Sequence, residues 1–267
     1  MRIFLVILFF LTVISFNMKS QDVTNWYKQA NNAFDSLNYK RALDCFTKVI
    51  IINPKDEKAH FNRALTYDSL HNFKLAIKDY SKIIEINPRD TDSYYNRGFD
   101  YFELKKYKLA VIDFSKVIEL NPKDTEAYLN RGDSYYELRK YQLALEDFLQ
   151  AIKLNPNDAD ALCNAGTAYC LLKKQKEGIE YYNKAIAINP KDGDFYDNRG
   201  SAYFDLKNYS LALKDYDKAI ELDSTNEEYY RNRSDAKLFL NDYDGSDEDR
   251  KLWKELKKFE KSKNKNK

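Results

Sequence analysis

The sequence predicts an all-α protein made of tandem helix–turn–helix repeats, and three observations support this prediction. The five prolines of the chain recur every 34 residues, and each directly follows an asparagine. Glycines and aromatic residues recur with the same period. Within one period, apolar residues follow the spacing of an amphipathic helix. A fixed period of this length indicates an array of equivalent structural repeats that stack on one another.

The composition is that of a soluble helical protein. Hydrophobic residues make up 43% of the chain and charged residues 32%, which does not fit a disordered chain. The net charge of +2 gives no signal for nucleic-acid binding. Cys45, Cys163 and Cys170 have neither zinc-site spacing nor a disulfide pattern. We expect these cysteines to be packing residues, with exposure of Cys163 to a groove as the alternative.

The first 20 residues differ from the rest of the chain. Arg2 precedes an apolar segment over residues 3–16, which fits the core of a signal peptide and is short for a membrane span. Ser20 is an acceptable small residue before a cleavage site. We therefore expect cleavage near residue 20 and an exported protein that is periplasmic, secreted or envelope-associated. An uncleaved N-terminal anchor is the alternative, and it would be the protein's contact with a membrane.

Seven repeats follow when proline is assigned to position 32 of each. The last repeat precedes a basic tail, residues 261–267, which we expect to be disordered. The repeats span residues 23–56, 57–90, 91–124, 125–158, 159–192, 193–226 and 227–260.

Each repeat has the pattern of two helices joined by a polar turn. In the third repeat, Tyr94, Gly98 and Tyr101 follow helical spacing, and Ala110 and Phe114 begin a second helical pattern. The asparagine and proline at positions 31 and 32 end the second helix, because a residue before proline avoids helical geometry. Small residues at positions 8 and 20 and rings at positions 11 and 24 predict close packing of the two helices.

This pattern resembles the tetratricopeptide repeat, which has an aromatic residue at position 4, a small one at 8, tyrosine at 11, alanine at 20, an aromatic at 24 and proline at 32. The resemblance covers residues 23–260. It implies a right-handed α-solenoid, a superhelix of antiparallel hairpins whose first helices line the concave face. The first repeat departs slightly at Ala33 and Phe34. The seventh has Ser246 and Arg250 at its small and aromatic positions, which is typical of a terminal capping repeat.

Arginine at position 7 and aspartate at position 23 change together from repeat to repeat. Both are absent from repeat 1, which has Gln29 and Cys45, and from repeat 5, which has Ala165 and Tyr181. We predict an ion pair between the two helices of each remaining hairpin, because a planar guanidinium suits a fixed carboxylate. A functional row of arginines is the alternative. The predicted pairs are Arg63 with Asp79, Arg97 with Asp113, Arg131 with Asp147, Arg199 with Asp215, and Arg233 with Asp249.

The resemblance also implies that positions 2, 5, 9, 12 and 13 face the groove, and here those positions are largely acidic and aromatic. We expect such a groove to bind a protein or peptide segment that carries basic and apolar residues. The alternative is that acidic residues only favour helix starts, which accounts for position 2 but not for positions 9 and 13. The predicted groove residues are Tyr27, Phe61, Tyr95, Phe99, Phe102, Glu103, Leu129, Asp133, Tyr136, Glu137, Asp197 and Phe204.

Two other classes of function fit less well. Some members of the family clamp acidic chaperone tails, but here Tyr27, Asp92 and Asn96 stand where the clamp needs lysine or arginine, and an acidic groove would repel an acidic tail. Catalysis lacks a candidate, because His60 and His71 have neither metal-site spacing nor a nucleophile partner, and no glycine-rich phosphate loop is present. The sequence predicts a non-catalytic interaction scaffold without cofactor or metal. A membrane-tethered adaptor of an envelope assembly or secretion machine is the alternative, and a co-chaperone is disfavoured.

Overall fold

The computed structural model describes residues 21–265, which are helical apart from short turns. The predicted signal peptide, residues 1–20, lies outside the described residues. The first described helix covers residues 21–35. The helices that follow are α2 (Tyr39–Ile52), α3 (Glu57–Ser69), α4 (Phe73–Ile86), α5 (Thr91–Glu103), α6 (Tyr107–Leu120), α7 (Thr125–Glu137), α8 (Tyr141–Leu154), α9 (Ala159–Leu171), α10 (Gln175–Ile188), α11 (Gly193–Asp205), α12 (Tyr209–Leu222), α13 (Glu227–Phe239) and α14 (Tyr243–Lys265).

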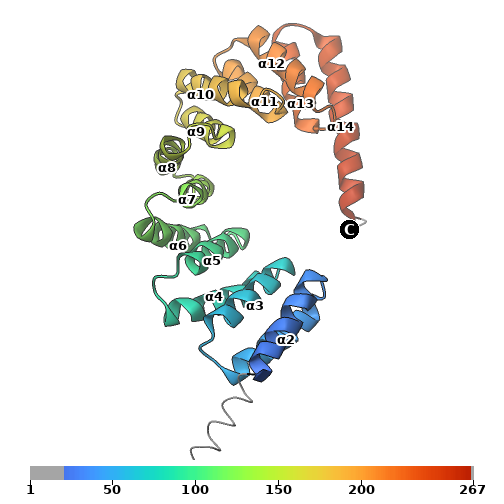
Figure 1. The fold of residues 1–267 in the computed structure, drawn as a ribbon. Helices are drawn as coiled ribbons and strands as arrows, with labels where there is room; N and C mark the ends of the chain where they lie inside the picture. Colours follow the sequence, from blue (N-terminus) through green and yellow to red (C-terminus); the bar gives the residue numbers. More distant parts are fainter. Residues whose placement is uncertain (1–20, 266–267) are drawn as a thin grey trace, which may run out of the picture. The chain divides into compact units, whose positions relative to one another are not determined.

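The helices pack in consecutive pairs, as Figure 1 shows. Within a repeat the first helix lies against the second, as in α3 with α4 or α11 with α12. Second helices also pack on the first helix of the next repeat, as in α2 with α3, α4 with α5, α8 with α9, α10 with α11 and α12 with α13, and α11 contacts both α9 and α13. The fold is therefore the all-α solenoid that the sequence predicts.

The chain divides into two compact parts, Met1–Ala127 and Tyr128–Lys267, here called the N-terminal half and the C-terminal half. Each half contains several complete hairpins with their own buried rings. Within residues 21–265, no helix combines the length and the apolar character that crossing a membrane requires.

From α3 onward, each first helix begins beside a side chain that caps it. Asp90 accepts a hydrogen bond from the backbone N–H of Ser93 at 2.8 Å, and Asp158 does the same for Ala161 at 2.9 Å. These bonds satisfy N–H groups that the first turn of a helix leaves without partners. At the end of a repeat, Asn53 has φ −131° and ψ 90°, so the chain has left helical geometry directly before the proline.

The core of each hairpin is an aromatic ring of the second helix packed on a small residue of the first. Phe114 and Phe148 are almost completely buried, at 0% and 1% exposure. A Cβ added to Gly98 would lie 3.0 Å from the Phe114 ring, and one added to Gly132 would lie 2.6 Å from the Phe148 ring. Carbon atoms normally pack at about 3.5–4 Å. The glycines at position 8 therefore allow the rings to fit between the helices.

The turn inside each repeat contains a residue with left-handed backbone geometry at position 15. Only Asn241 belongs to a residue type that adopts this geometry readily. The other turns adopt it because the two helices must reverse direction within a few residues. The residues are Leu37, His71, Lys105, Arg139, Lys173, Lys207 and Asn241, with φ between 53° and 65°.

The last helix differs from the sequence prediction. The tail was expected to be disordered from residue 261, but α14 continues as a helix to Lys265. No proline or glycine follows Phe259 to end the helix. Lys261, near its C-terminus, also favours the helix dipole. The basic residues of this segment consequently extend the capping repeat.

Candidate functional site

Arginine and aspartate side chains join the two helices of five hairpins. Arg199 donates to Asp215 from Nε at 2.8 Å and from Nη2 at 2.7 Å. In all five repeats the aspartate contacted is the one that the sequence paired with that arginine. This hydrogen bonding to the Asp215 carboxylate raises the pKa of Arg199. The same two-bond arrangement joins Arg63 to Asp79, Arg97 to Asp113, Arg131 to Asp147 and Arg233 to Asp249.

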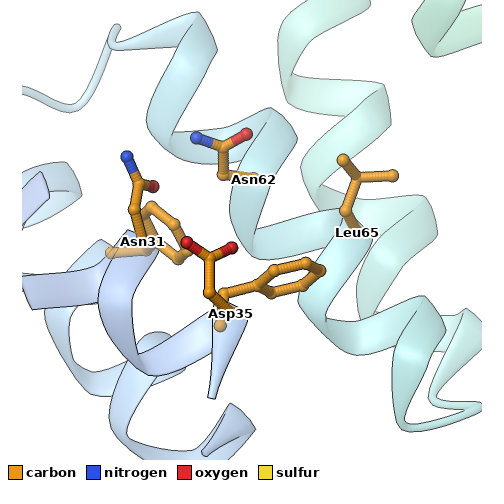
Figure 2. Close-up of a pocket in the computed structure, with 6 residues that line it drawn as sticks. Asn31, Asp35, Asn62 and Leu65 are labelled. Carbon is orange, nitrogen blue, oxygen red and sulfur yellow. The ribbon is translucent and has the colours of Figure 1, made fainter. Parts of the chain in front are cut away.

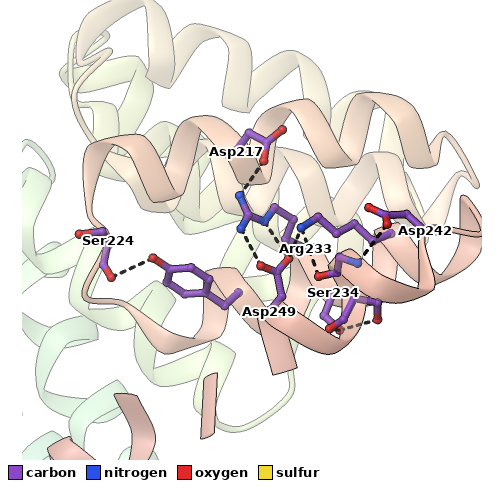
Figure 3. A network of polar contacts seen from close by, with 10 residues as sticks. Asp217, Ser224, Arg233, Ser234, Asp242 and Asp249 are labelled. Atoms are coloured by element: carbon purple, nitrogen blue, oxygen red, sulfur yellow. Dashed lines mark hydrogen bonds and ion pairs between the residues drawn. The ribbon is translucent and has the colours of Figure 1, made fainter. Parts of the chain in front are cut away.

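In four of these arginines, the remaining nitrogen reaches the preceding repeat. Figure 3 shows Arg233 between Asp249 of its own repeat and Asp217 of α12. The contact is 2.8 Å long, and the residue reached stands at position 25. Equivalent bonds run from Arg63 to Thr47 (3.1 Å), from Arg97 to Ser81 (3.0 Å) and from Arg199 to Asn183 (2.7 Å). The guanidinium groups are engaged inside the solenoid, which favours the structural interpretation over a functional row of arginines.

The predicted groove residues at position 5 contribute to hairpin packing. Each of the rings at this position in the first three repeats meets the buried ring at position 24 edge-on, and each is half-buried. Their orientation leaves only part of each ring for a partner. The centroid distances are 6.2 Å for Tyr27 and Phe46, 5.7 Å for Phe61 and Tyr80, and 5.8 Å for Tyr95 and Phe114.

Further along the chain, position 5 is also drawn toward the interior. Leu129 packs against the buried cluster around Phe148. Cys163 is 7% exposed and belongs to the core of repeat 5. Asp197 accepts two hydrogen bonds from Asn232 of the next repeat, at 2.9 and 3.1 Å. Position 5 is thus mainly a packing position in this protein.

Positions 9, 12 and 13 present more of their surface. Phe99 is 43% exposed, Tyr136 is 36% exposed, and the carboxylates of Glu103 and Glu137 are exposed. The ring at position 12 is held edge-on by a tyrosine at the start of the second helix. These ring pairs are Phe102 with Tyr107 at 5.3 Å, Tyr136 with Tyr141 at 5.8 Å, and Phe204 with Tyr209 at 5.2 Å.

Two of the predicted acidic residues have unusual surroundings. Burial, and secondarily the nearby charge of Glu137, raises the pKa of Asp133 to about 6. Burial also raises the pKa of Asp197 to about 6, against the opposing effect of the hydrogen bond from Asn232. Burying a charged carboxylate without a countercharge costs free energy. A cation that binds beside Asp133 or Asp197 would therefore stabilise its charged form.

Three pockets among the described residues lie along the hairpins, and two of them contain residues of the predicted groove. A pocket of about 200 Å³ contains Phe61, and one of about 140 Å³ contains Phe204. A third, of about 90 Å³, lies between repeats 1 and 2 and is shown in Figure 2. It is lined by Asn31, Phe34, Asp35, Phe46, Asn62 and Leu65.

The residues that line this third pocket are not among the predicted groove residues, because that prediction rests on position 5 and on the acidic positions of the middle repeats. A usable signal was present. An aromatic residue followed by an acidic one occupies positions 12 and 13 of four repeats, as in Phe34-Asp35 and Phe204-Asp205.

One of the two histidines of repeat 2, His60, has a structural role in the interior of the hairpin. His60 is 5% exposed, and its Nδ1 lies 2.8 Å from Asp79 Oδ1 while Nε2 lies 3.2 Å from the carbonyl oxygen of Pro54. Across residues 21–265, no group of three or more His, Cys, Asp or Glu side chains is arranged to hold a metal ion.

Comparison with known proteins agrees with this architecture. The sequence model of the tetratricopeptide repeat family matches residues 57–90, 91–124, 125–158, 159–192 and 198–226. No curated protein matches the sequence.

Several solved structures are similar. A tetratricopeptide repeat protein from Parabacteroides merdae is 19% identical, with a TM-score of 0.72 over 88% of this chain and 93% of that one, which shows the fold alone. YrrB, described as a protein of this type with an unusual peptide-binding site, is 26% identical, with a TM-score of 0.59 over 67% of this chain and 92% of that one. A MamA structure is 26% identical, with a TM-score of 0.58 over 60% of this chain and 94% of that one.

Proposed function

The chain belongs to the tetratricopeptide repeat family, and from this we propose that it is a non-catalytic scaffold which binds a segment of another polypeptide. The binding surface would be the face of the first helices, where positions 9, 12 and 13 lie. The similarity to YrrB, which has a peptide-binding site, supports this class of partner.

The proposal rests on one observation: arginine side chains are used in the interior of the hairpins, whereas acidic side chains are exposed on this face. The position-7 arginines of five repeats are used in internal ion pairs, as with Arg199 and Asp215. The exposed charges at position 13 are acidic, as with Glu103 and Glu137, and they lie beside the half-exposed Phe99 and Tyr136. Acidic groups interspersed with rings favour a partner that carries basic and apolar side chains.

Affinity capture with a surface variant tests this proposal. Phe99→Ala combined with Glu103→Lys and Glu137→Lys changes exposed side chains and leaves the hairpin cores intact. The full chain and this variant are immobilised and exposed to extract from cells that produce the protein, and bound polypeptides are identified by mass spectrometry. We expect the variant to lose its captured polypeptides.

A control on the second helices separates this surface from a general charge effect. Leu109→Ala with Glu119→Lys and Glu146→Lys makes the same change of charge and also shortens one apolar side chain, at exposed positions of α6 and α8. We expect this control to capture polypeptides as the unchanged chain does. Equal loss in both variants would assign the effect to net charge and contradict the proposed surface.

We also propose that the protein is exported through residues 1–20. The charged start and the apolar segment of those residues support this. N-terminal sequencing of the protein from an extracytoplasmic fraction distinguishes a cleaved chain that begins near residue 21 from an anchored chain. An intact N-terminus in the membrane fraction would favour the tethered adaptor.

A further inference from the structure

We infer that two equivalent pockets, one in each half, each bind a single lysine or arginine side chain of the partner. This inference rests on the proposed function and specifies how the face of the first helices would select its ligand. It is carried by the matching positions of the two pockets, by the placement of their acidic residues, and by the polar groups left without partners.

The two pockets are built from the same positions of the repeat. Each uses positions 9, 12, 13 and 24 of one repeat and positions 6 and 9 of the next. One is lined by Asn31, Phe34, Asp35, Phe46, Asn62 and Leu65, and the other by Ser201, Phe204, Asp205, Tyr216, Asn232 and Asp235. A ring at position 12, an aspartate at position 13 and an asparagine at position 6 are common to both.

The aromatic wall of each pocket is fixed in place. Phe34 meets Tyr39 edge-on at 5.6 Å, and Phe204 meets Tyr209 at 5.2 Å and Phe239 at 5.4 Å. Because these contacts hold the rings from the side, a ligand finds a preformed apolar surface. The methylene stem of a basic side chain can lie along such a surface while its charged end reaches beyond it.

The aspartates stand where a helix does not favour them. Asp35 is the last residue of the helix over residues 21–35, and Asp205 is the last residue of α11. The C-terminal end of a helix carries partial negative charge, so an acidic side chain there is electrostatically unfavourable. Helix stability therefore does not explain these residues, whereas attraction of a cation does.

The polar groups of the first pocket are available to a ligand. Among the described residues, the side chains of Asn31, Asp35 and Asn62 form neither a hydrogen bond nor an ion pair. Figure 2 shows the side chains of Asn31, Asp35 and Asn62 together at this pocket. In the second pocket the carboxylate already has a partner within the protein, because Asp205 accepts a 3.3 Å hydrogen bond from Gln175. We therefore expect the first pocket to bind the basic side chain more tightly.

The size and charge of the pockets define the ligand group. Volumes of about 90 and 140 Å³ suit one side chain rather than a folded element. An acidic side chain would be repelled by Asp35 or Asp205, and a purely apolar one would bury the carboxylate without a countercharge. A lysine or arginine side chain can pack its methylene groups on the ring and form an ion pair with the carboxylate.

Selection from a random displayed peptide library tests the inference with a defined probe. The library is selected on the full chain, on Asp35→Asn with Asp205→Asn, and on the control Asp44→Asn, which changes an exposed aspartate of α2. We expect peptides selected on the full chain and on the control to be enriched in lysine and arginine at fixed positions. We expect that enrichment to disappear from peptides selected on the double variant.

Binding of one selected peptide is then measured by fluorescence anisotropy. Each single aspartate variant should weaken binding about three- to fivefold, the effect of losing one partly exposed ion pair. Replacing the anchoring basic residue of the peptide with norleucine should weaken binding to the full chain and have little further effect on the matching variant. Such non-additive losses would place the basic side chain next to the aspartate.

The possible failures are distinguishable. Peptides that bind specifically without basic enrichment would contradict the pocket assignment and leave the proposed function standing. A library that yields no specific peptide on the full chain would contradict the proposed function and the pocket assignment with it. Equal weakening by Asp44→Asn would also overturn the assignment, because it would show a general charge effect.

Discussion

The carboxyl groups of Asp68 of α3 and Asp100 of α5 interact with each other at the contact between two neighbouring repeats. Asp100 is 1% exposed, and the Tyr80 hydroxyl donates to Asp68 Oδ2 at 2.7 Å. Asp68 Oδ1 and Asp100 Oδ2 are buried and have no hydrogen-bond partner among the described residues. One carboxyl must therefore carry a proton. Burial, and then the charge of Asp68, raises the pKa of Asp100 to about 9.

This pair predicts that stability falls as pH rises. Between the ordinary aspartate pKa of 3.8 and the raised value of about 9, the folded chain holds a proton on Asp100 that the unfolded chain has released. Asp100→Asn should remove this dependence, since an amide donates to Asp68 without titrating. We expect urea midpoints at pH 5 and pH 8 to lie closer together in this variant than in the unchanged chain. Parallel pH dependence of the two chains would contradict the shared proton.

The ion pair of repeat 6 predicts a second experiment, on stability. Arg199→Ala leaves Asp215 buried without its countercharge, which should cost about 3 kcal/mol. Repeat 5 offers a natural replacement, since it has Ala165 and Tyr181 at the same positions, with Tyr181 packed 5.2 Å from Tyr169. The double variant Arg199→Ala with Asp215→Tyr should therefore lose less stability than Arg199→Ala alone. Urea unfolding followed by circular dichroism measures both, and a larger loss in the double variant would refute this reasoning.

The glycines of position 8 predict different responses to the same substitution. Alanine is favoured over glycine in a helix by about 1 kcal/mol. At Gly132 the added carbon would meet the Phe148 ring at 2.6 Å, so overpacking should outweigh this gain and destabilise by about 1 kcal/mol. At Gly98 the distance to Phe114 is 3.0 Å, and we expect a change close to zero. Thermal midpoints of the two variants compare these effects, and equal midpoints would show that both rings yield equally.

The left-handed turn residues predict stabilising substitutions. Lys173 has φ 63°, a conformation that costs a residue with a Cβ about 1 kcal/mol and glycine very little. Lys173→Gly should raise the free energy of unfolding by about 0.5–1 kcal/mol. The adjacent Lys174 has φ −113°, so Lys174→Gly should be neutral or destabilising and serves as the control. Chemical unfolding of both variants decides the matter, and a loss of stability in Lys173→Gly would contradict it.

The sequence predicted the features that repeat in register. The proline period predicts where each hairpin begins and ends. The joint change of positions 7 and 23 predicts which arginine pairs with which aspartate. Both signals arise because each repeat solves the same packing problem. The second role of the arginines was missed, since Thr47, Ser81, Asn183 and Asp217 share a position but not a residue type.

Features that occur once, or between different positions, were not predictable in this way. Asp68 stands at position 12 and Asp100 at position 10 of the next repeat, so comparison of equivalent positions does not connect them. The rings at position 5 were assigned to the groove by resemblance, but Tyr27 and Tyr95 are half-buried against rings of the second helix. Lysine and arginine at position 15 carry no turn signal, because the hairpin imposes their backbone geometry.

The arginine bridge that is missing from repeat 5 has a mechanical consequence. Elsewhere in the C-terminal half, Arg199 and Arg233 fasten successive repeats with directional bonds that resist sliding. Between α8 and α9, Ala165 belongs to an apolar cluster against which Leu149 packs, and such non-directional contacts tolerate a change of register. We therefore expect elasticity to concentrate at this joint when the chain is stretched. In an optical-tweezers experiment, a Leu149→Asp and Ala165→Arg variant should require more force for its first extension step.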